Sequence, residues 1–176
     1  MRTTDMPDIR LPQKPTVEDA ADVLRRISAD RDFLGTCVLP LLGEAAKARG
    51  WYVAHSSAHG PCTLQVFVWP PGTATRVHDH SSWGAFCCVA GSVVEERYGR
   101  LDDGRTPEHA RLRRLWRRRW GGRSGISTVL PYEGGIHRLA NPSAEPAVSV
   151  HLYGPRSGKI DGRDYAPLRD YVCDRV

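Results

Sequence analysis

Residues 72–91 read GTATRVHDHSSWGAFCCVAG, and this stretch decides the fold. His78 and His80 stand two positions apart, so on a strand both side chains project from the same face. The flanking sequence turns sharply, which exposes that face to a cavity. Two imidazoles on one face of a rigid element can bind one metal ion from adjacent positions, and the spacing therefore predicts half of a metal site.

A second stretch, GISTVLPYEGGIHRLAN at residues 125–141, supplies a third histidine, His137. It places a strand, a Pro/Gly turn and a histidine in the order that a barrel requires. Three neutral imidazoles leave three adjacent positions open in an octahedral shell, which suits an Fe(II) ion that binds both a substrate and dioxygen. We therefore expect Fe(II) as the cofactor, held by His78, His80 and His137.

The rest of the chain after Gly50 consists of short apolar runs separated by turn residues. The runs are LQVFVW, AFCCVAGSVVEERY, ISTVL and AVSVHLYG, and their close spacing is typical of strands joined by tight turns. No alternation of strand and helix is present, so the sequence favours an all-β barrel or sandwich.

The N-terminal part has helical periodicity instead. We expect a helix that is capped by Thr16 and ends near Ser28, and a second helical stretch over residues 33–49 that is interrupted at Pro40. The expected organisation is one domain in three parts. An arm and helices (1–50) pack on the barrel, the barrel itself spans 51–158, and a polar tail (159–176) wraps the surface.

The composition of the chain excludes several classes of protein. The 176 residues include five cysteines and carry a formal net charge of +5. The cysteine count is odd and no C-x-x-C pair occurs, so we expect reduced thiols, with Cys87 and Cys88 buried. No apolar run is long enough for a membrane span or a secretory signal, and the expected compartment is the cytoplasm. The basic run from Arg111 to Arg123 is interpreted as a solvated strand pair, and no nucleic-acid partner is expected.

The two histidine stretches resemble the paired cupin motifs, G-x5-H-x-H-x3-4-E-x6-G and G-x5-P-x-G-x2-H-x3-N, with one extra residue between Pro131 and Gly134. The glutamate of the first motif falls at Gly84. A three-histidine site without this carboxylate is similar to the cysteine dioxygenase branch of cupins, the thiol dioxygenases. The run HDHSSWG is similar to one in bacterial 3-mercaptopropionate dioxygenases. The resemblance covers roughly Trp51 to Arg156 and implies a cupin double-stranded β-helix, or jelly-roll barrel.

Ser149, His151 and Tyr153 alternate along one predicted strand, so all three point the same way. Their segment, SVHLYG, resembles an S-x-H-x-Y segment shared by the branch. The resemblance implies that a substrate thiolate binds iron and that both atoms of dioxygen pass to sulfur, giving a sulfinate. Tyr153, held by His151 and Ser149, would then hydrogen-bond the substrate.

The chain departs from the family at two positions. Gly84 stands where mammalian-type enzymes have a cysteine linked to the active-site tyrosine, so no such link is expected. The family's carboxylate-binding arginine or glutamine is also missing, because Tyr52 or Ala54 occupies its position. Arg76 and His55 are candidate replacements. With two further candidates for the pocket, they make up the predicted substrate-binding set: Tyr52, His55, Trp83 and Arg76.

Several functions remain open from the sequence. The first is a thiol dioxygenase acting on cysteine or a mercapto-acid. A variant is a specialised cysteine-oxidising cupin of secondary metabolism that gives a further-oxidised or decarboxylated product, such as a sulfonamide. A third option cleaves a carbon–carbon bond, although the SVHLYG segment argues against it. The alternative from another class of function is a metal-dependent binding or sensing module without turnover. The state of assembly is open between a monomer and a homodimer.

Overall fold

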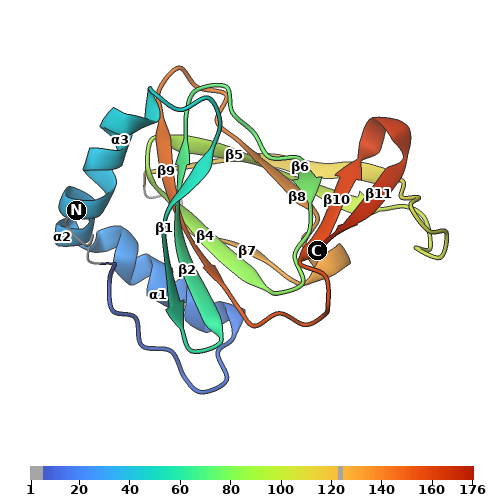
Figure 1. Ribbon diagram of the computed structural model, residues 1–176, viewed down its shortest axis with the longest axis horizontal. Helices are drawn as coiled ribbons and strands as arrows, with labels where there is room; N and C mark the ends of the chain where they lie inside the picture. Colours follow the sequence, from blue (N-terminus) through green and yellow to red (C-terminus); the bar gives the residue numbers. More distant parts are fainter. Residues whose placement is uncertain (1–5, 123–124) are drawn as a thin grey trace.

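Two antiparallel sheets face each other, with short helices on the outer side of the first (Figure 1). This computed structural model describes residues 6–122 and 125–176. The first sheet has the order β1 (Tyr52–His59), β2 (Cys62–Trp69), β9 (Ala147–Tyr153), β4 (Gly84–Ala90) and β7 (Ser127–Val129). The second has the order β11 (Tyr171–Arg175), β10 (Gly162–Ala166), β3 (Val77–His78), β8 (His137–Ala140), β5 (Ser92–Arg100) and β6 (Leu112–Gly121).

The helical region begins at the predicted cap. Thr16 and Asp19 form a capping box that starts α1 (Val17–Ala29), because each side chain accepts a hydrogen bond from the other residue's backbone N–H. The next segment is nearly continuous, with α2 (Arg31–Phe33), a π-helical turn η1 (Leu34–Val38) and α3 (Leu39–Ala45). Pro40 lies in the first turn of α3, directly after the π-helical turn. Proline has no backbone N–H to donate, and the π-helical turn accommodates the missing hydrogen bond.

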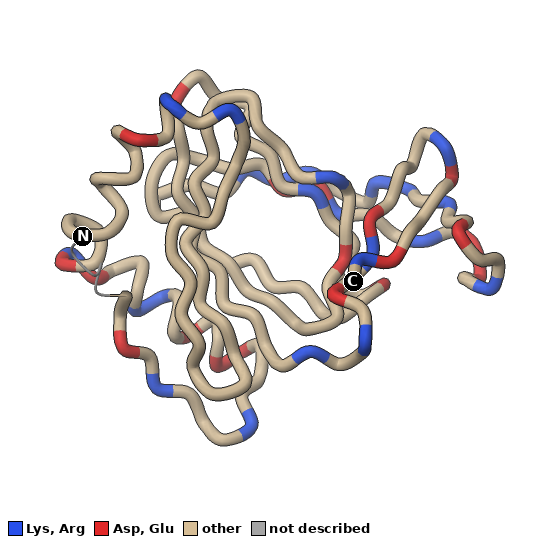
Figure 2. The backbone as a smooth tube through the Cα atoms, viewed as in Figure 1, with Lys and Arg blue, Asp and Glu red and all other residues tan. Residues whose placement is uncertain are grey.

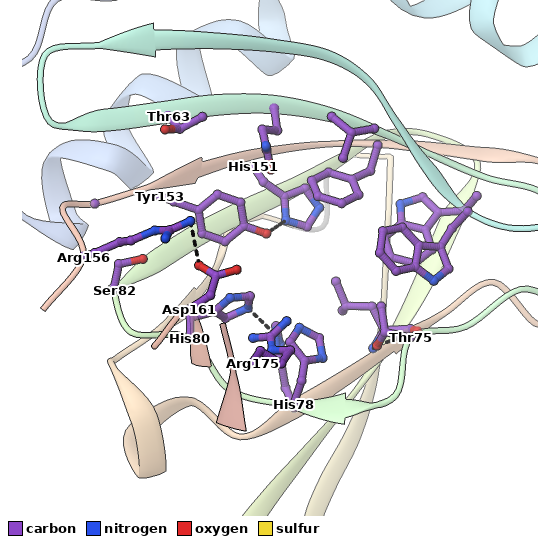
Figure 3. A pocket seen from close by; sticks show the side chains of 18 of the residues that line it. Thr63, Thr75, His78, His80, Ser82, His151, Tyr153, Arg156, Asp161 and Arg175 are labelled. Carbon is purple, nitrogen blue, oxygen red and sulfur yellow. Dashed lines mark hydrogen bonds and ion pairs between the residues drawn. The ribbon is translucent and has the colours of Figure 1, made fainter. Parts of the chain in front are cut away.

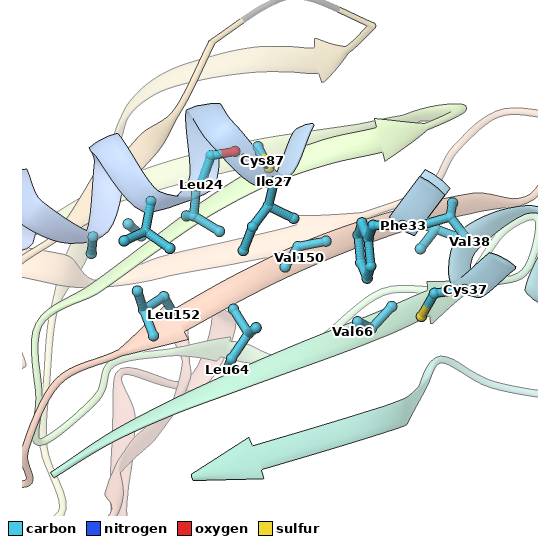
Figure 4. Close-up of a cluster of buried hydrophobic side chains, with 14 of the residues drawn as sticks. Leu24, Ile27, Phe33, Cys37, Val38, Leu64, Val66, Cys87, Val150 and Leu152 are labelled. Carbon is cyan, nitrogen blue, oxygen red and sulfur yellow. Dashed lines mark hydrogen bonds between the residues drawn. The ribbon is translucent and has the colours of Figure 1, made fainter. Parts of the chain in front are cut away.

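The helices cover the outer face of the first sheet. Leu24 and Ile27 of α1 pack with Leu64, Val150 and Leu152 of the sheet, as Figure 4 shows. Each such buried aliphatic side chain stabilises the fold by about 1.5–3 kcal/mol. The outer face of this sheet is therefore buried in the core between the helices and the barrel.

Strand alternation turns a different set of side chains toward the second sheet. On β9, Val148, Val150 and Leu152 belong to the helix-side core, so the alternate positions Ser149 and His151 face inward. The strands β2 and β4 alternate in the same way, because Phe67 and Phe86 lie in a separate hydrophobic cluster between the sheets. The inner face is where the polar residues of the first sheet gather.

The C-terminal segment differs from the expectation of a tail over residues 159–176. It contains the hairpin β10–β11, and β10 also pairs with β3, where Asp164 lies opposite His78. A short 3₁₀ turn, η3 (Pro167–Arg169), joins the two strands. The hairpin is held by the buried Asp79, which accepts hydrogen bonds from Arg163 N at 2.7 Å and from Tyr165 Oη at 2.8 Å. The polar composition of this segment concealed its strands.

Charge is distributed unevenly between the two sheets (Figure 2). The five strands of the first sheet contain no Lys, Arg, Asp or Glu within their described ranges, whereas β6 carries a row of arginines. Arg114 and Arg117 pair with Glu96, and the Arg118 guanidinium lies 4.2 Å from the Trp120 ring centre. Arg123, at the end of the predicted basic run, is outside the described residues.

The described ranges contain no helix that is long and apolar enough to cross a membrane. The cytoplasmic location and the lack of a nucleic-acid partner stay predictions.

Candidate metal centre

The three predicted histidines come together between the sheets. His78 on β3 lies directly opposite His137 on β8, and His80 follows two residues after His78. One nitrogen of each ring lies within 4.8 Å of the others. In Figure 3, His78 and His80 point into the same space. The structure therefore assembles the cluster from two segments that are far apart in the sequence, as the motif spacing predicts.

The hydrogen bonds of the cluster suit a metal site. His78 Nδ1 lies 3.0 Å from the Arg76 carbonyl oxygen and His137 Nδ1 lies 3.0 Å from Glu95 Oε1, so each Nδ1–H donates and each Nε2 keeps a free lone pair. His80 Nε2 is 3.2 Å from His137 Nε2. Two adjacent ligands of an octahedral ion, each about 2.1 Å from it, stand about 3 Å apart.

The protonation of the cluster also favours metal binding. Burial lowers the pKa of His78, His80 and His137, and for the last two neighbouring histidines lower it further. All three rings are therefore neutral near pH 7 and can act as ligands. The residues present fit a metal ion, and the donor set of three imidazoles suits Fe(II) among others.

Glu95 is a site residue that sequence reasoning missed. Its carboxylate is fully buried and, besides His137, accepts hydrogen bonds from Arg97 Nε at 2.7 Å, Trp120 Nε1 at 3.0 Å and Ser127 Oγ at 2.6 Å. A carboxylate behind a ligand histidine fixes the ring's tautomer and orientation. The sequence signal for this role was a glutamate inside an apolar strand, at a position whose side chain faces the space between the two sheets.

Ser149, His151 and Tyr153 form a hydrogen-bonded row, called the relay below. Ser149 Oγ is 2.7 Å from His151 Nε2, and His151 Nδ1 is 3.1 Å from Tyr153 Oη. Burial lowers the pKa of His151 to about 3 and raises that of Tyr153. The relay therefore ends in a neutral phenol, whose ring centre lies 5.2 Å from that of His80.

Gly84 lies directly opposite Tyr153 in the pairing of β4 with β9. A Cβ atom at Gly84 would lie 3.1 Å from Tyr153 Cδ1, so this position is next to the phenol ring. Because the residue is glycine, it offers no sulfur for a bond to the ring.

A cavity of about 510 Å³ opens over the cluster and the relay (Figure 3). One end is polar and the other is aromatic, with Trp51, Phe67 and Trp69 stacked along it. The polar end includes two arginines that sequence reasoning did not single out, Arg156 and Arg175. Arg156 pairs with Asp161 at 3.1 Å and is largely exposed.

Arg175, on β11, is the more enclosed of the two arginines. Its side chain is 30% exposed, and Nη2 donates to the carbonyl oxygen of Asp79. Its Nε is 3.5 Å from Asp164 Oδ1, a long contact. Its positive charge lies close enough to His78 and His80 to lower the pKa of both. The sequence did not indicate a role for Arg175, because this residue lies in the segment that was expected to form a polar tail.

The predicted substrate-binding set, Tyr52, His55, Trp83 and Arg76, is not among the described residues that line this cavity. Arg76 precedes β3, so strand alternation does not aim it inward, and its side chain is 78% exposed beside Asp164. Tyr52 packs in the helix-side core, while its neighbours Trp51 and Val53 line the cavity.

The other two members of the set also lie elsewhere. Trp83 contributes to the helix-side core and covers Gly154, where a Cβ atom would come within 2.2 Å of the indole. His55 lies on the edge strand β1, next to the irregularity between Val53 and His55.

Comparisons with known proteins find a matching family model and solved structures of low sequence identity. A family model of cysteine dioxygenase type I matches residues 49–164. Similar solved structures include TT1209 from Thermus thermophilus, at 20% identity over 63% of this chain and 89% of that chain, with a TM-score of 0.47. A Cupin 2 conserved barrel domain protein from Salinispora arenicola CNS-205 has 17% identity over 59% and 73%, with a TM-score of 0.40. A cupin superfamily protein from Desulfitobacterium hafniense DCB-2 has 11% identity over 61% and 82%, with a TM-score of 0.42.

The predicted fold class is confirmed: the chain is mostly β, with two facing antiparallel sheets and a small helical region, as in a cupin double-stranded β-helix. The family match spans well over half of the 176 residues and contains all three histidines of the cluster. The chain belongs to the cysteine dioxygenase type I family.

Proposed function

We propose that the protein is an Fe(II)-dependent thiol dioxygenase that oxidises a small thiol bearing a carboxylate, such as cysteine or a mercapto-acid, to its sulfinate. One observation carries the proposal. Three neutral imidazoles, His78, His80 and His137, converge on a cavity that is also lined by the phenol of Tyr153. Family membership supports the same reaction class.

The three histidines would hold the ferrous ion through their Nε2 atoms. When bound, the ion offers open positions at which a thiolate and dioxygen meet. Glu95 would keep the His137 ring in the orientation that presents Nε2, because it holds the opposite nitrogen. Both atoms of dioxygen end on sulfur, so the balance is one thiol and one dioxygen for one sulfinic acid.

Tyr153 would act on the bound substrate as a hydrogen-bond donor. Its hydroxyl is held by His151 Nδ1 at 3.1 Å, and its pKa is raised by burial, so the phenol keeps its proton at neutral pH. A preorganised donor stabilises negative charge that develops on the reacting atoms.

Arg175 would bind the substrate carboxylate. It lines the cavity, and its contacts with the other described residues, a backbone carbonyl and a long contact to Asp164, leave most of its five donors for a ligand. A guanidinium can bind a carboxylate through two parallel hydrogen bonds. This proposal replaces Arg76, which lies outside the cavity.

Oxygen uptake by the protein reconstituted anaerobically with Fe(II) tests the function. We expect uptake with cysteine, 3-mercaptopropionate or mercaptosuccinate, coupled to a product heavier by two oxygen atoms. Cysteamine, which lacks a carboxylate, serves as the matched poor substrate. Uptake with loss of carbon would indicate the specialised oxidation that yields a product such as a sulfonamide. Stoichiometric binding of iron and thiol without uptake would contradict turnover and indicate a sensor.

A further inference from the structure

The relay extends to a fourth residue, Trp69, at the end of β2. Trp69 Nε1 lies 2.8 Å from Ser149 Oγ, across the β2–β9 pair. Trp69 and Ser149 are fully buried and His151 is 3% exposed. A row of hydrogen bonds therefore runs from the indole at the aromatic end of the cavity to the phenol of Tyr153, and its first three members are buried.

The indole N–H of Trp69 determines which atom accepts the hydrogen of the Ser149 hydroxyl. An indole N–H can only donate, so Ser149 Oγ accepts from Trp69. The one hydrogen of the serine hydroxyl then needs an acceptor, since leaving a buried donor unpaired is costly. Within residues 6–122 and 125–176, His151 Nε2 is the other polar atom in hydrogen-bond contact with Ser149 Oγ. Nε2 must therefore accept.

The direction of the next bond follows from the ring of His151. Phe67 and Phe86 pack against it, with ring centres at 4.4 Å and 5.0 Å, which disfavours a charged imidazole. A neutral ring that accepts at Nε2 carries its hydrogen on Nδ1. His151 Nδ1–H thus donates to Tyr153 Oη.

We propose that Trp69 is a positioning residue that sets the direction of the relay, so that every hydrogen bond points toward Tyr153 and the phenol meets its ligand as a donor. The ligand atom beside Tyr153 is then an acceptor, such as a thiolate or an anionic oxygen. Without the indole N–H, Ser149 can accept from Nε2–H instead. His151 Nδ1 then accepts from Tyr153, and the phenol hydrogen points away from the cavity.

The tautomer of His151 tests the proposal directly. Imidazole nitrogen NMR shifts of the full chain with isotope-labelled histidine report which ring nitrogen carries the hydrogen, and His151→Gln identifies the signal. We expect hydrogen on Nδ1 in the unmodified protein and a mixture of tautomers in Trp69→Phe. Trp51→Phe is the matched control, because Trp51 stacks on Trp69 at 5.7 Å but donates nothing to the relay in the described contacts. It should leave the tautomer unchanged.

A hydrogen on Nε2 in the unmodified protein, or an unchanged tautomer in Trp69→Phe, would overturn the proposal. If Trp69→Phe does not fold, Ser149→Ala replaces it, because that change also removes the donor to Nε2 and should give the same mixture. The consequence for turnover rests on the proposed function: kcat of Trp69→Phe should fall about fivefold, as for one typical hydrogen bond, at unchanged iron content. The tautomer does not depend on thiol oxidation, so an inactive protein with the expected tautomer would refute only the function.

Discussion

Glu95 Oε1 lies 3.0 Å from His137 Nδ1, so a fully buried carboxylate orients one of the three histidines of the cluster. The carboxylate stands one layer behind the ring and on the neighbouring strand, β5. The glutamate of the resembled cupin motif falls at Gly84, whereas Glu95, the buried carboxylate next to the cluster, contacts it through His137.

Glu95→Gln should weaken metal binding about 10- to 100-fold, as is typical when the partner of a ligand histidine is lost. The amide keeps the shape of the side chain but removes its charge and one acceptor oxygen. Competition against a chelator of known affinity measures the effect. Glu96→Gln is the matched control, because Glu96 pairs with Arg114 and Arg138 away from the cluster. Equal metal affinity in both folded variants would mean that Glu95 has no part in metal binding.

The metal-free protein should lose stability in mild acid because of His151. Its pKa falls from 6.5 to about 3 on folding, so the unfolded state binds the proton first. The contribution is fully present above pH 6.5 and is lost as the pH falls toward 3. Urea unfolding between pH 8 and 5 should show a loss about 2 kcal/mol larger for the unmodified protein than for His151→Gln. Parallel curves for the two proteins would contradict the buried neutral state.

The sequence predicts those parts of the site that depend on local periodicity. His78 and His80 share a strand face because they are two apart, and the same rule places Ser149, His151 and Tyr153 in one row. The motif spacing then brings in the third histidine from a distant segment. These predictions needed no knowledge of how the sheets pack.

The missed residues depend on contacts across the fold. Glu95 stands in the run VVEERY directly before a second glutamate, Glu96, and only the pairing of β5 with β8 brings Glu95 behind His137. Arg175 lies close to the end of a polar segment whose strands become evident once Asp79 is seen to be buried. The position of Trp51 required the register of β1, since a shift of one residue exchanges the cavity face for the helix face.

Tyr153→Phe should lower turnover about 100- to 1,000-fold while leaving iron content nearly unchanged, because the phenol donates to the reacting group but binds no metal. Steady-state oxygen uptake and iron content per chain measure the two effects. Tyr165→Phe removes another enclosed phenol, which donates to Asp79 at 2.8 Å in the C-terminal hairpin. That control should lower stability more than turnover. Equal losses of iron and activity in Tyr153→Phe would indicate a structural role.

Arg175→Ala should lower kcat/KM about 10- to 100-fold for thiols that carry a carboxylate, the value of a charge-assisted hydrogen-bonded pair. The loss should appear mainly in KM, because a carboxylate is bound equally before and during the reaction. Cysteamine, which has no carboxylate, should be little affected, and this difference separates lost recognition from a distorted cluster.

The same substitution at Arg76 decides between the two arginines. Both contact Asp164, at 3.4 Å from Arg76 and 3.5 Å from Arg175, but only the second lines the cavity that holds the histidine cluster and Tyr153. Arg76→Ala should therefore leave KM for cysteine within about twofold, as expected for an exposed surface charge. Arg175→Lys keeps the charge but loses the planar pair of donors, so it should restore only part of the affinity. If Arg76→Ala raises KM and Arg175→Ala does not, the substrate carboxylate binds at Arg76, directly before β3, and the C-terminal hairpin serves stability alone.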